Sequence, residues 1–203
     1  MSKVSQNGVM EKVLTIPQDQ TEIIEFNVKG VTPLIVHKFS EKIIKQLEEK
    51  KSGAGKKGRE NCDPEREYLD ALHICEDGTP GFPASGFKLS MVRASKNLGH
   101  KMTDVRTSFV ILADDLVNQY VYINGEHEMR TDWVKVGNGG ADIRYRPMFK
   151  KWSAELKIKF NPNYISAEQL ATLLKEAGAF VGIGEWRPSS NKSGSYGTFE
   201  LVS

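Results

Sequence analysis

The sequence has few cysteines, no long apolar run and almost no net charge, and each shortage excludes a class of protein. Two cysteines, Cys62 and Cys75, cannot form a disulfide framework or supply a zinc site on their own. No stretch approaches the ~20 apolar residues that span a bilayer, so no membrane association is expected. The polar N-terminus lacks the apolar core of a secretory signal, so the expected location is the cytoplasm.

Sequence motifs of the common enzyme classes are missing as well. No Gly-Lys-Ser/Thr sequence closes a phosphate-binding loop, and no HExxH pattern, nucleophile elbow or carboxylate pair is present. The histidines have no metal-ligand spacing, so neither a metal nor another cofactor is expected. His37, directly after an apolar run, is a candidate acid–base residue for metal-independent cleavage of RNA, although packing is the commoner role. A non-catalytic protein is the leading interpretation.

What is present predicts one α+β domain over residues 21–203, after a flexible N-terminal arm at 1–20. The order of elements favours a ferredoxin-like or RRM-like antiparallel sheet with helices on one face. A flexible basic loop at 51–62 and a hairpin or loop insertion at 118–152 interrupt it, and Asn124-Gly125 is expected to turn the hairpin. The expected strands are 21–28, 107–112, 119–123, 131–136, 154–160, 180–183 and 196–202, and the expected helices are 41–51, a short one from 64, 84–98 and 167–177.

The net charge of +2 hides an uneven distribution along the chain. Residues 84–106 carry five basic residues and one acidic residue, and residues 130–159 carry eight basic and three acidic residues. Residues 107–129 between them carry four acidic residues and no basic one. If the two basic blocks converge on one face, they form a patch suited to a phosphate backbone. Two separate solvated faces are the alternative.

Two segments combine the residue types that a nucleic-acid groove requires. Residues 182–199 are rich in glycine, which permits close approach of another backbone, and the cations and rings among them suit phosphates and bases. Residues 144–152 interleave four cations with three aromatic residues. The alternatives are a tight turn that the fold requires and a basic loop anchored by its rings. The candidate contacts are Lys38, Lys88, Arg93, Lys96, Arg144, Arg146, Lys150, Lys151, Trp152, Gly182, Gly184, Arg187, Lys192, Tyr196 and Gly197.

Several segments resemble a family of small bacteriophage and prophage proteins. They are Gly-Val-Thr-Pro-Leu-Ile-Val-His-Lys-Phe at 30–39, Tyr-Arg-Pro-Met-Phe-Lys-Lys-Trp at 145–152, Val-Gly-Ile-Gly-Glu-Trp-Arg-Pro at 181–188 and Tyr-Gly-Thr-Phe at 196–199. That family is similar in turn to the RAMP superfamily, the RRM-like proteins that build the backbone of CRISPR effector complexes. The resemblance implies a ferredoxin-like core with a β-hairpin insertion, which binds single-stranded RNA along a basic groove and assembles head-to-tail. It also implies that Gly182, Gly184 and Gly197 form a glycine-rich loop against the nucleic acid.

These observations lead to one hypothesis and two alternatives. The hypothesis is a non-catalytic protein that binds single-stranded DNA or RNA and oligomerises along the strand. Because the chain is short for a CRISPR backbone subunit, we expect a stand-alone phage protein in the host cytoplasm, with a role in replication, recombination or counter-defence. One alternative is a RAMP-type endoribonuclease that uses His37. The other is a CRISPR backbone-like or anti-CRISPR protein that acts through contacts with phage or defence-system proteins.

Overall fold

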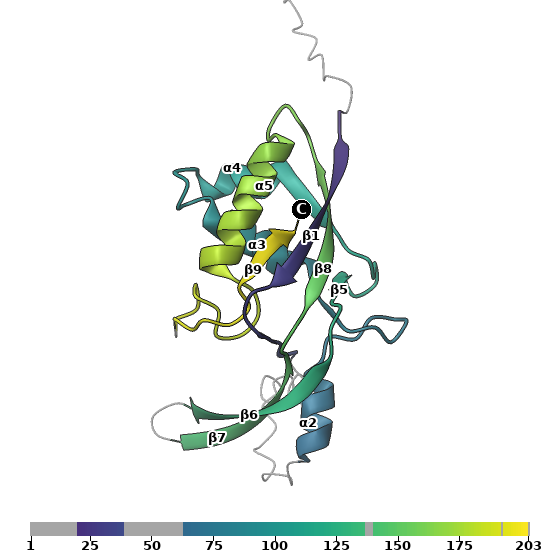
Figure 1. The fold of residues 1–203 in the computed structure, drawn as a ribbon, viewed down its shortest axis with the longest axis vertical. Coiled ribbons are helices and arrows are strands. Elements are labelled where there is room, and N and C mark those ends of the chain that lie inside the picture. Colours follow the sequence, from purple (N-terminus) through teal and green to yellow (C-terminus); the bar gives the residue numbers. More distant parts are fainter. Residues whose placement is uncertain (1–19, 39–62, 137–139, 192, 203) are drawn as a thin grey trace, which may run out of the picture.

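A four-stranded antiparallel sheet with helices on one face organises the structure (Figure 1). The computed structural model describes residues 20–38, 63–136, 140–191 and 193–202. The strands, in their order across the sheet, are β4 (Phe109–Leu112), β8 (Ser153–Phe160), β1 (Glu22–Gly30) and β9 (Phe199–Val202). The packed helices are α3 (Ala84–Ala94), α4 (Met102–Ser108) and α5 (Ala167–Glu176). The chain order β1, α3, β4, β8, α5, β9 is the βαββαβ order of a ferredoxin-like fold, which confirms the predicted fold class.

The core forms because the central strands alternate apolar and polar residues. On β8, Leu156 and Ile158 are fully buried against the helices, while Lys157 and Lys159 project to the opposite face. The adjacent strand β1 pairs with β8 along eight positions, so its own apolar residues reach the same side. Helix α5 begins at Ser166, whose side chain forms a capping box with Gln169, and its leucines complete the core.

The outer face of this sheet is not a base-stacking surface. RRM-like proteins stack bases on aromatic residues of their sheet. Here the outer positions of the four strands carry mixed charges and aliphatic side chains, with no aromatic residue among them. They include Ile23, Glu25, Asn27 and Lys29 on β1, Glu155, Lys157 and Lys159 on β8, Val110 on β4, and Glu200 and Val202 on β9. The outer face of the sheet therefore lacks the aromatic rings on which RRM-like proteins stack bases.

Two insertions into the ferredoxin-like core build a second layer. The first, between β1 and α3, contains β2 (Leu34–Ile35), α2 (Pro64–Asp70) and β3 (Gly81–Pro83). The second, between β4 and β8, contains β5 (Tyr120–Tyr122) and the long hairpin of β6 (His127–Val136) and β7 (Gly140–Phe149). β2, β7 and β6 form a three-stranded sheet that extends beyond the core, with α2 beside it (Figure 1). Its hairpin confirms that this insertion contains paired strands.

The details of the hairpin differ from the expectation. Residues 119–123 were expected to pair with 131–136, but β5 pairs with β3, and β6 pairs with β7. Most of 144–152 lies in strand β7 and not in a basic loop, because residues 144–149 pair with β6. Arg144, Arg146 and Met148 alternate along β7 and so share one of its faces. The expected strand at 180–183 is also wrong, since a π-helical turn, η1 (Ala177–Val181), continues α5.

Several predicted segments lie outside the described residues, and the described helices bear on the question of a membrane span. The arm at 1–19, the helix at 41–51, the loop at 51–62 and the predicted contact Lys192 lie outside the residues that the structure describes. None of the helices in the described part of the chain has the length and apolar character needed to cross a membrane.

Candidate functional site

The glycine-rich loop, residues 182–198 between η1 and β9, is held against its own chain. Gly182, Gly184 and Gly197 all have positive φ, at 69°, 73° and 67°. A Cβ at Gly197 would collide with the carbonyl oxygen of Ile183, and one at Gly184 would collide with that of Ile35. Intramolecular packing therefore accounts for these glycines. Whether they also contact nucleic acid stays a prediction.

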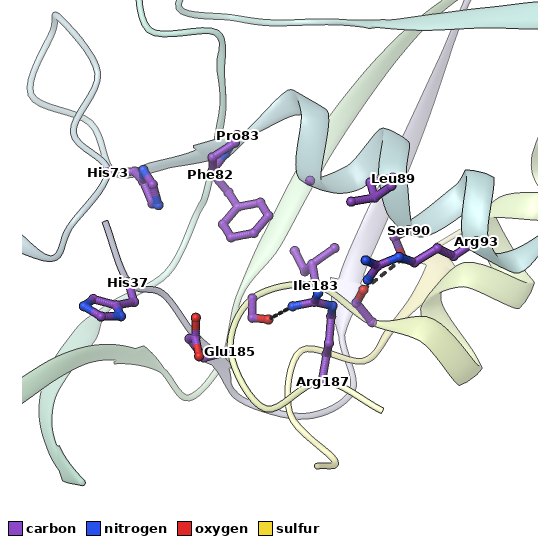
Figure 2. A pocket seen from close by; sticks show the side chains of 13 residues that line it. His37, His73, Phe82, Pro83, Leu89, Ser90, Arg93, Ile183, Glu185 and Arg187 are labelled. Atoms are coloured by element: carbon purple, nitrogen blue, oxygen red, sulfur yellow. Dashed lines mark hydrogen bonds between the residues drawn. The ribbon is translucent and has the colours of Figure 1, made fainter. Parts of the chain in front are cut away.

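A cavity of about 260 Å³ opens between this loop and helix α3 (Figure 2). Two hydrogen bonds from side chains fix its wall: Ser90 Oγ donates to the carbonyl oxygen of Gly182 at 2.9 Å, and Arg187 Nη1 donates to that of Gly184 at 2.7 Å. Its walls come from α3, β3, the loop, and the segments that carry two histidines. The lining residues used below are His37, His73, Phe82, Arg93, Glu185 and Arg187.

One end of the cavity carries two arginines (Figure 2). Arg187 is held in place, because its Nε also donates to Ser189 Oγ at 3.2 Å. Burial, and then the charge of Arg93, lowers the pKa of Arg187. Among the described residues, no carboxylate lies within ion-pair distance of either arginine. The charge of Glu185, which lines the same cavity beyond ion-pair distance, acts in the opposite direction on the pKa of Arg187. Two like charges thus face one cavity without an acid at ion-pair distance, an arrangement that favours an anion.

The other end of the cavity carries His37, His73 and the ring of Phe82 (Figure 2). His73 packs edge-on to Phe82 at 6.0 Å between ring centroids. Burial, followed by the charges of Lys38 and His37, lowers the pKa of His73 to about 4. Burial and then the charge of Arg146 lower the pKa of His37. Both imidazoles are therefore mainly neutral near pH 7, and this end of the cavity is aromatic and uncharged.

A second pair of arginines lies on the hairpin, next to Trp186 and Tyr196 of the glycine-rich loop. Arg130 on β6 and Arg146 on β7 are cross-strand partners. Asp132 joins them: its Oδ1 accepts from Arg130 Nε at 2.7 Å, and its Oδ2 lies 3.5 Å from Arg146 Nη1. The side chains of Asp132 and Arg146 are only 2% and 3% exposed. This carboxylate therefore neutralises a buried cation at the base of the hairpin.

Trp186 and Tyr196 connect that second pair to the loop. The guanidinium of Arg130 lies 5.2 Å from the Trp186 ring centroid and 4.9 Å from that of Tyr196, within the range of cation–π contacts. Arg130 Nη1 also donates to Tyr196 Oη at 2.9 Å. The two rings are half-buried and lie 6.1 Å apart, so part of each remains at the surface. The hairpin thus braces the loop that forms the cavity.

The structure brings some of the predicted contacts to this loop. Arg93 and Arg187 share the cavity with Gly182 and Gly184. Arg146 and Tyr196 lie in the second cluster, so each of the two basic blocks contributes an arginine near the loop. Arg144 is half-exposed at the edge of this region, with Nε 4.0 Å from Asp142.

Other predicted contacts lie elsewhere. Trp152 is 3% exposed and donates its indole N–H to the Thr32 carbonyl oxygen at 2.9 Å, so this buried ring does not fit the expected role of stacking on a base. Lys150 pairs with Glu128 at 2.8 Å and lines a separate cavity with Lys151. Lys88 lies over the Phe109 ring, and Lys96 is exposed beyond α3. The backbone N–H of Lys38 donates to the carbonyl oxygen of Ala71 at 2.9 Å.

Sequence reasoning missed four residues of the site. Arg130 and Asp132 are two positions apart on a strand, and cross-strand pairing with Arg146 would have indicated them if 140–149 had been recognised as a strand. Glu185 stands inside the glycine-rich segment, where its negative charge excluded it from a search for phosphate contacts. No sequence pattern indicated His73, because its neighbours in the cavity are distant in the chain.

Comparison with known proteins leaves the family open. No family model matches the sequence, and no curated protein is a significant relative. Among solved structures, the chain is similar to the crystal structure of Cmr6 from Pyrococcus furiosus, with a TM-score of 0.44 and 9% sequence identity. The match covers 91% of this chain and 100% of that one. The identity is too low to transfer the role of any residue, and the resemblance to RAMP proteins stays a prediction.

Proposed function

We propose that this protein binds single-stranded nucleic acid across its glycine-rich loop, without catalysing a reaction. One observation carries the proposal: Arg93 and Arg187 face the same cavity, and no carboxylate of the described residues pairs with either. Their charges repel each other, so a phosphate between them would relieve that repulsion while it accepts charge-assisted hydrogen bonds. Guanidinium groups suit phosphate because they present a planar fork of N–H donors.

The surroundings of the arginines favour a single strand over a duplex. Trp186 and Tyr196 are half-exposed beside the loop, and aromatic rings bind bases whose faces are accessible. In a duplex those faces are stacked on one another. The half-exposed Arg144 on β7 lies on the same face of the hairpin as Arg146 and extends the positive charge past the loop. The proposed strand therefore runs from the cavity across the loop toward the hairpin, and it can be DNA or RNA.

Fluorescence anisotropy tests this function. Labelled single-stranded DNA, single-stranded RNA and duplex DNA are titrated with the full chain between about 50 and 200 mM salt. We expect binding to one or both single strands and weaker binding to the duplex. The logarithm of the affinity is expected to fall linearly with the logarithm of the salt concentration, with a slope proportional to the number of phosphates contacted. No binding to any of the three at the lowest salt would overturn the proposal.

A ribonuclease activity has one observation in its favour, since His37 and His73 line the same cavity. Acid–base cleavage by two histidines requires one protonated and one neutral imidazole. The lowered pKa values of His37 and His73 leave both mainly neutral, which favours binding over cleavage. An incubation experiment distinguishes binding from cleavage. Structured and unstructured RNA are each incubated with the wild type and with His37→Ala in the presence of a chelator. Cleavage by the wild type alone would replace binding with catalysis as the function.

The proposal also includes an assembly state and a biological role. Head-to-tail oligomers along a strand, in phage replication, recombination or counter-defence, follow from the sequence resemblance. Light scattering of the protein with strands of increasing length measures the assembly. We expect the mass of the complex to rise in steps of one protomer, whereas a single protomer on every strand length would remove assembly from the proposal.

A further inference from the structure

The cavity between the glycine-rich loop and α3 has two chemically different ends and an acidic group between them. Arg93 and Arg187 mark the charged end, and Phe82 with the two histidines marks the aromatic end (Figure 2). In the same view Glu185 lies between His37 and Arg187. At about 260 Å³ the cavity is just below the ~300–1,000 Å³ of usual ligand pockets, so it suits one nucleotide unit and not a run of them.

Glu185 is held in place by the backbone, and its charge acts at longer range on Arg146 and Arg187, where it opposes the lowering of their pKa values by burial. Its N–H donates to the carbonyl oxygen of Ile35 at 2.8 Å, which ties the loop to strand β2 at this residue. Among the described residues, no cation lies within ion-pair distance of its carboxylate. An ionised carboxylate accepts hydrogen bonds and donates none, so its natural ligand in this cavity is a group with N–H donors.

From these contacts we infer that the cavity selects a guanine nucleotide unit, with the phosphate on Arg93 and Arg187 and the base against Phe82, its edge toward Glu185. The inference rests on the proposed function and adds a base preference to it. Guanine carries two adjacent N–H donor groups on its Watson–Crick edge and can bind a carboxylate through both oxygens. Uracil and thymine offer one ring N–H, and adenine and cytosine one amino group, so each forms a weaker pair with Glu185.

A competition experiment tests the base preference. The competitors are an oligouridine of about 12 nucleotides, the same strand with one central guanine, the two equivalent oligothymidine strands, and free GMP and UMP. We expect one guanine to strengthen binding by on the order of tenfold, the discrimination of a bidentate contact to a base edge. GMP is expected to compete better than UMP.

A variant assigns the preference to the carboxylate. Glu185→Gln is expected to abolish the guanine advantage while binding to the guanine-free strand stays equal or becomes tighter, because a negative charge near the phosphate is removed. Glu200→Gln, an exposed glutamate on the outer face of the sheet, is the matched control and keeps the advantage.

The outcomes separate this inference from the proposed function. Equal binding of strands with and without guanine overturns the base preference but leaves strand binding intact. Competition by GMP without any gain from a guanine in the strand identifies a free nucleotide as the ligand and overturns the placement of a strand in the cavity. If no strand and no nucleotide binds, both the inference and the proposed function fail.

Discussion

Two pairs of arginines lie at the glycine-rich loop, and they differ in whether a carboxylate lies within ion-pair distance. Arg130 and Arg146 share Asp132, which lies between them at the base of the hairpin. Arg93 and Arg187 share a cavity whose acid, Glu185, lies beyond ion-pair distance of both. The difference shows that residue type and local charge density do not identify a ligand site. What distinguishes the cavity is that, among the described residues, no carboxylate lies within ion-pair distance of its two arginines, and the predictions below test that distinction.

The largest expected effect is the loss of the shared carboxylate. Asp132→Asn removes the carboxylate that joins Arg130 to the buried guanidinium of Arg146, and it leaves Arg146 no acid of the described residues within ion-pair distance. Removing one partner of a buried pair costs about 3–5 kcal/mol of folding stability. Urea unfolding of the variant and the wild type measures the loss. Asp142→Asn is the control, because its half-exposed side chain lies 4.0 Å from Arg144, and it is expected to cost less than about 1 kcal/mol. Equal losses would remove the distinction between the two acids.

The folded protein is expected to lose stability in acid because of His73, which lines the cavity. Its pKa in the folded protein is about 4, below the ordinary 6.5, so the unfolded chain binds more protons between these values. Stability therefore rises with pH in this window and is lost as the pH falls from 6.5 toward 4. The full loss is on the order of 3 kcal/mol at 1.36 kcal/mol per pKa unit.

Comparison of His73→Gln with the wild type isolates this contribution. The variant is expected to show a flatter dependence of unfolding free energy on pH between 6.5 and about 4, whatever its absolute stability. His100→Gln, at an exposed histidine after α3, is the control for replacing a histidine by glutamine. A wild-type slope in His73→Gln would show that His73 is not the group that titrates.

The core of the fold was predictable because it depends on local alternation and capping. The apolar alternation in 154–160 and the Ser166 cap of α5 act within a few residues, and both indicated the correct element. The pairing of 119–123 was wrong because β5 pairs with β3, a strand of three residues whose sequence, Gly-Phe-Pro, has no strand pattern. Pairing between distant segments depends on tertiary packing, which local propensity does not contain.

The site was predictable in part for the same reason. Arg187 and the glycines stood out because they lie in one unusual segment of sequence. The charge of Arg93 marked it as a candidate contact, but the sequence did not show that it shares a cavity with Arg187, since α3 and the loop meet only in the folded chain. The ring of Trp152 was misjudged because its tight packing against Gly30, which excludes any Cβ there, joins residues far apart in sequence.

A medium effect is expected in the glycine-rich loop itself, which carries Arg187. Gly197→Ala adds a Cβ that collides with the carbonyl oxygen of Ile183, at a φ of 67°, and is expected to cost about 2 kcal/mol or more. Gly78→Ala, with a φ of 86° but no atom within 4 Å of its Cβ, bears only the conformational cost of about 1 kcal/mol. Thermal unfolding measures both. If Gly197→Ala is no worse than Gly78→Ala, the loop is not packed as described.

The smallest expected effect is the most informative about the unpaired arginines. Arg93→Gln removes a cation that pairs with no carboxylate of the described residues, so its stability is expected to stay within about 0.5 kcal/mol of the wild type. Its affinity for a single strand is expected to fall about tenfold at low salt, with the salt slope reduced by about one. Arg106→Gln, an exposed arginine on α4 in the same basic block, is the control and leaves both values unchanged. Should Arg93→Gln instead lose stability and keep its affinity, the cavity arginines would be structural like the pair around Asp132, and the difference between the two pairs would have no functional meaning.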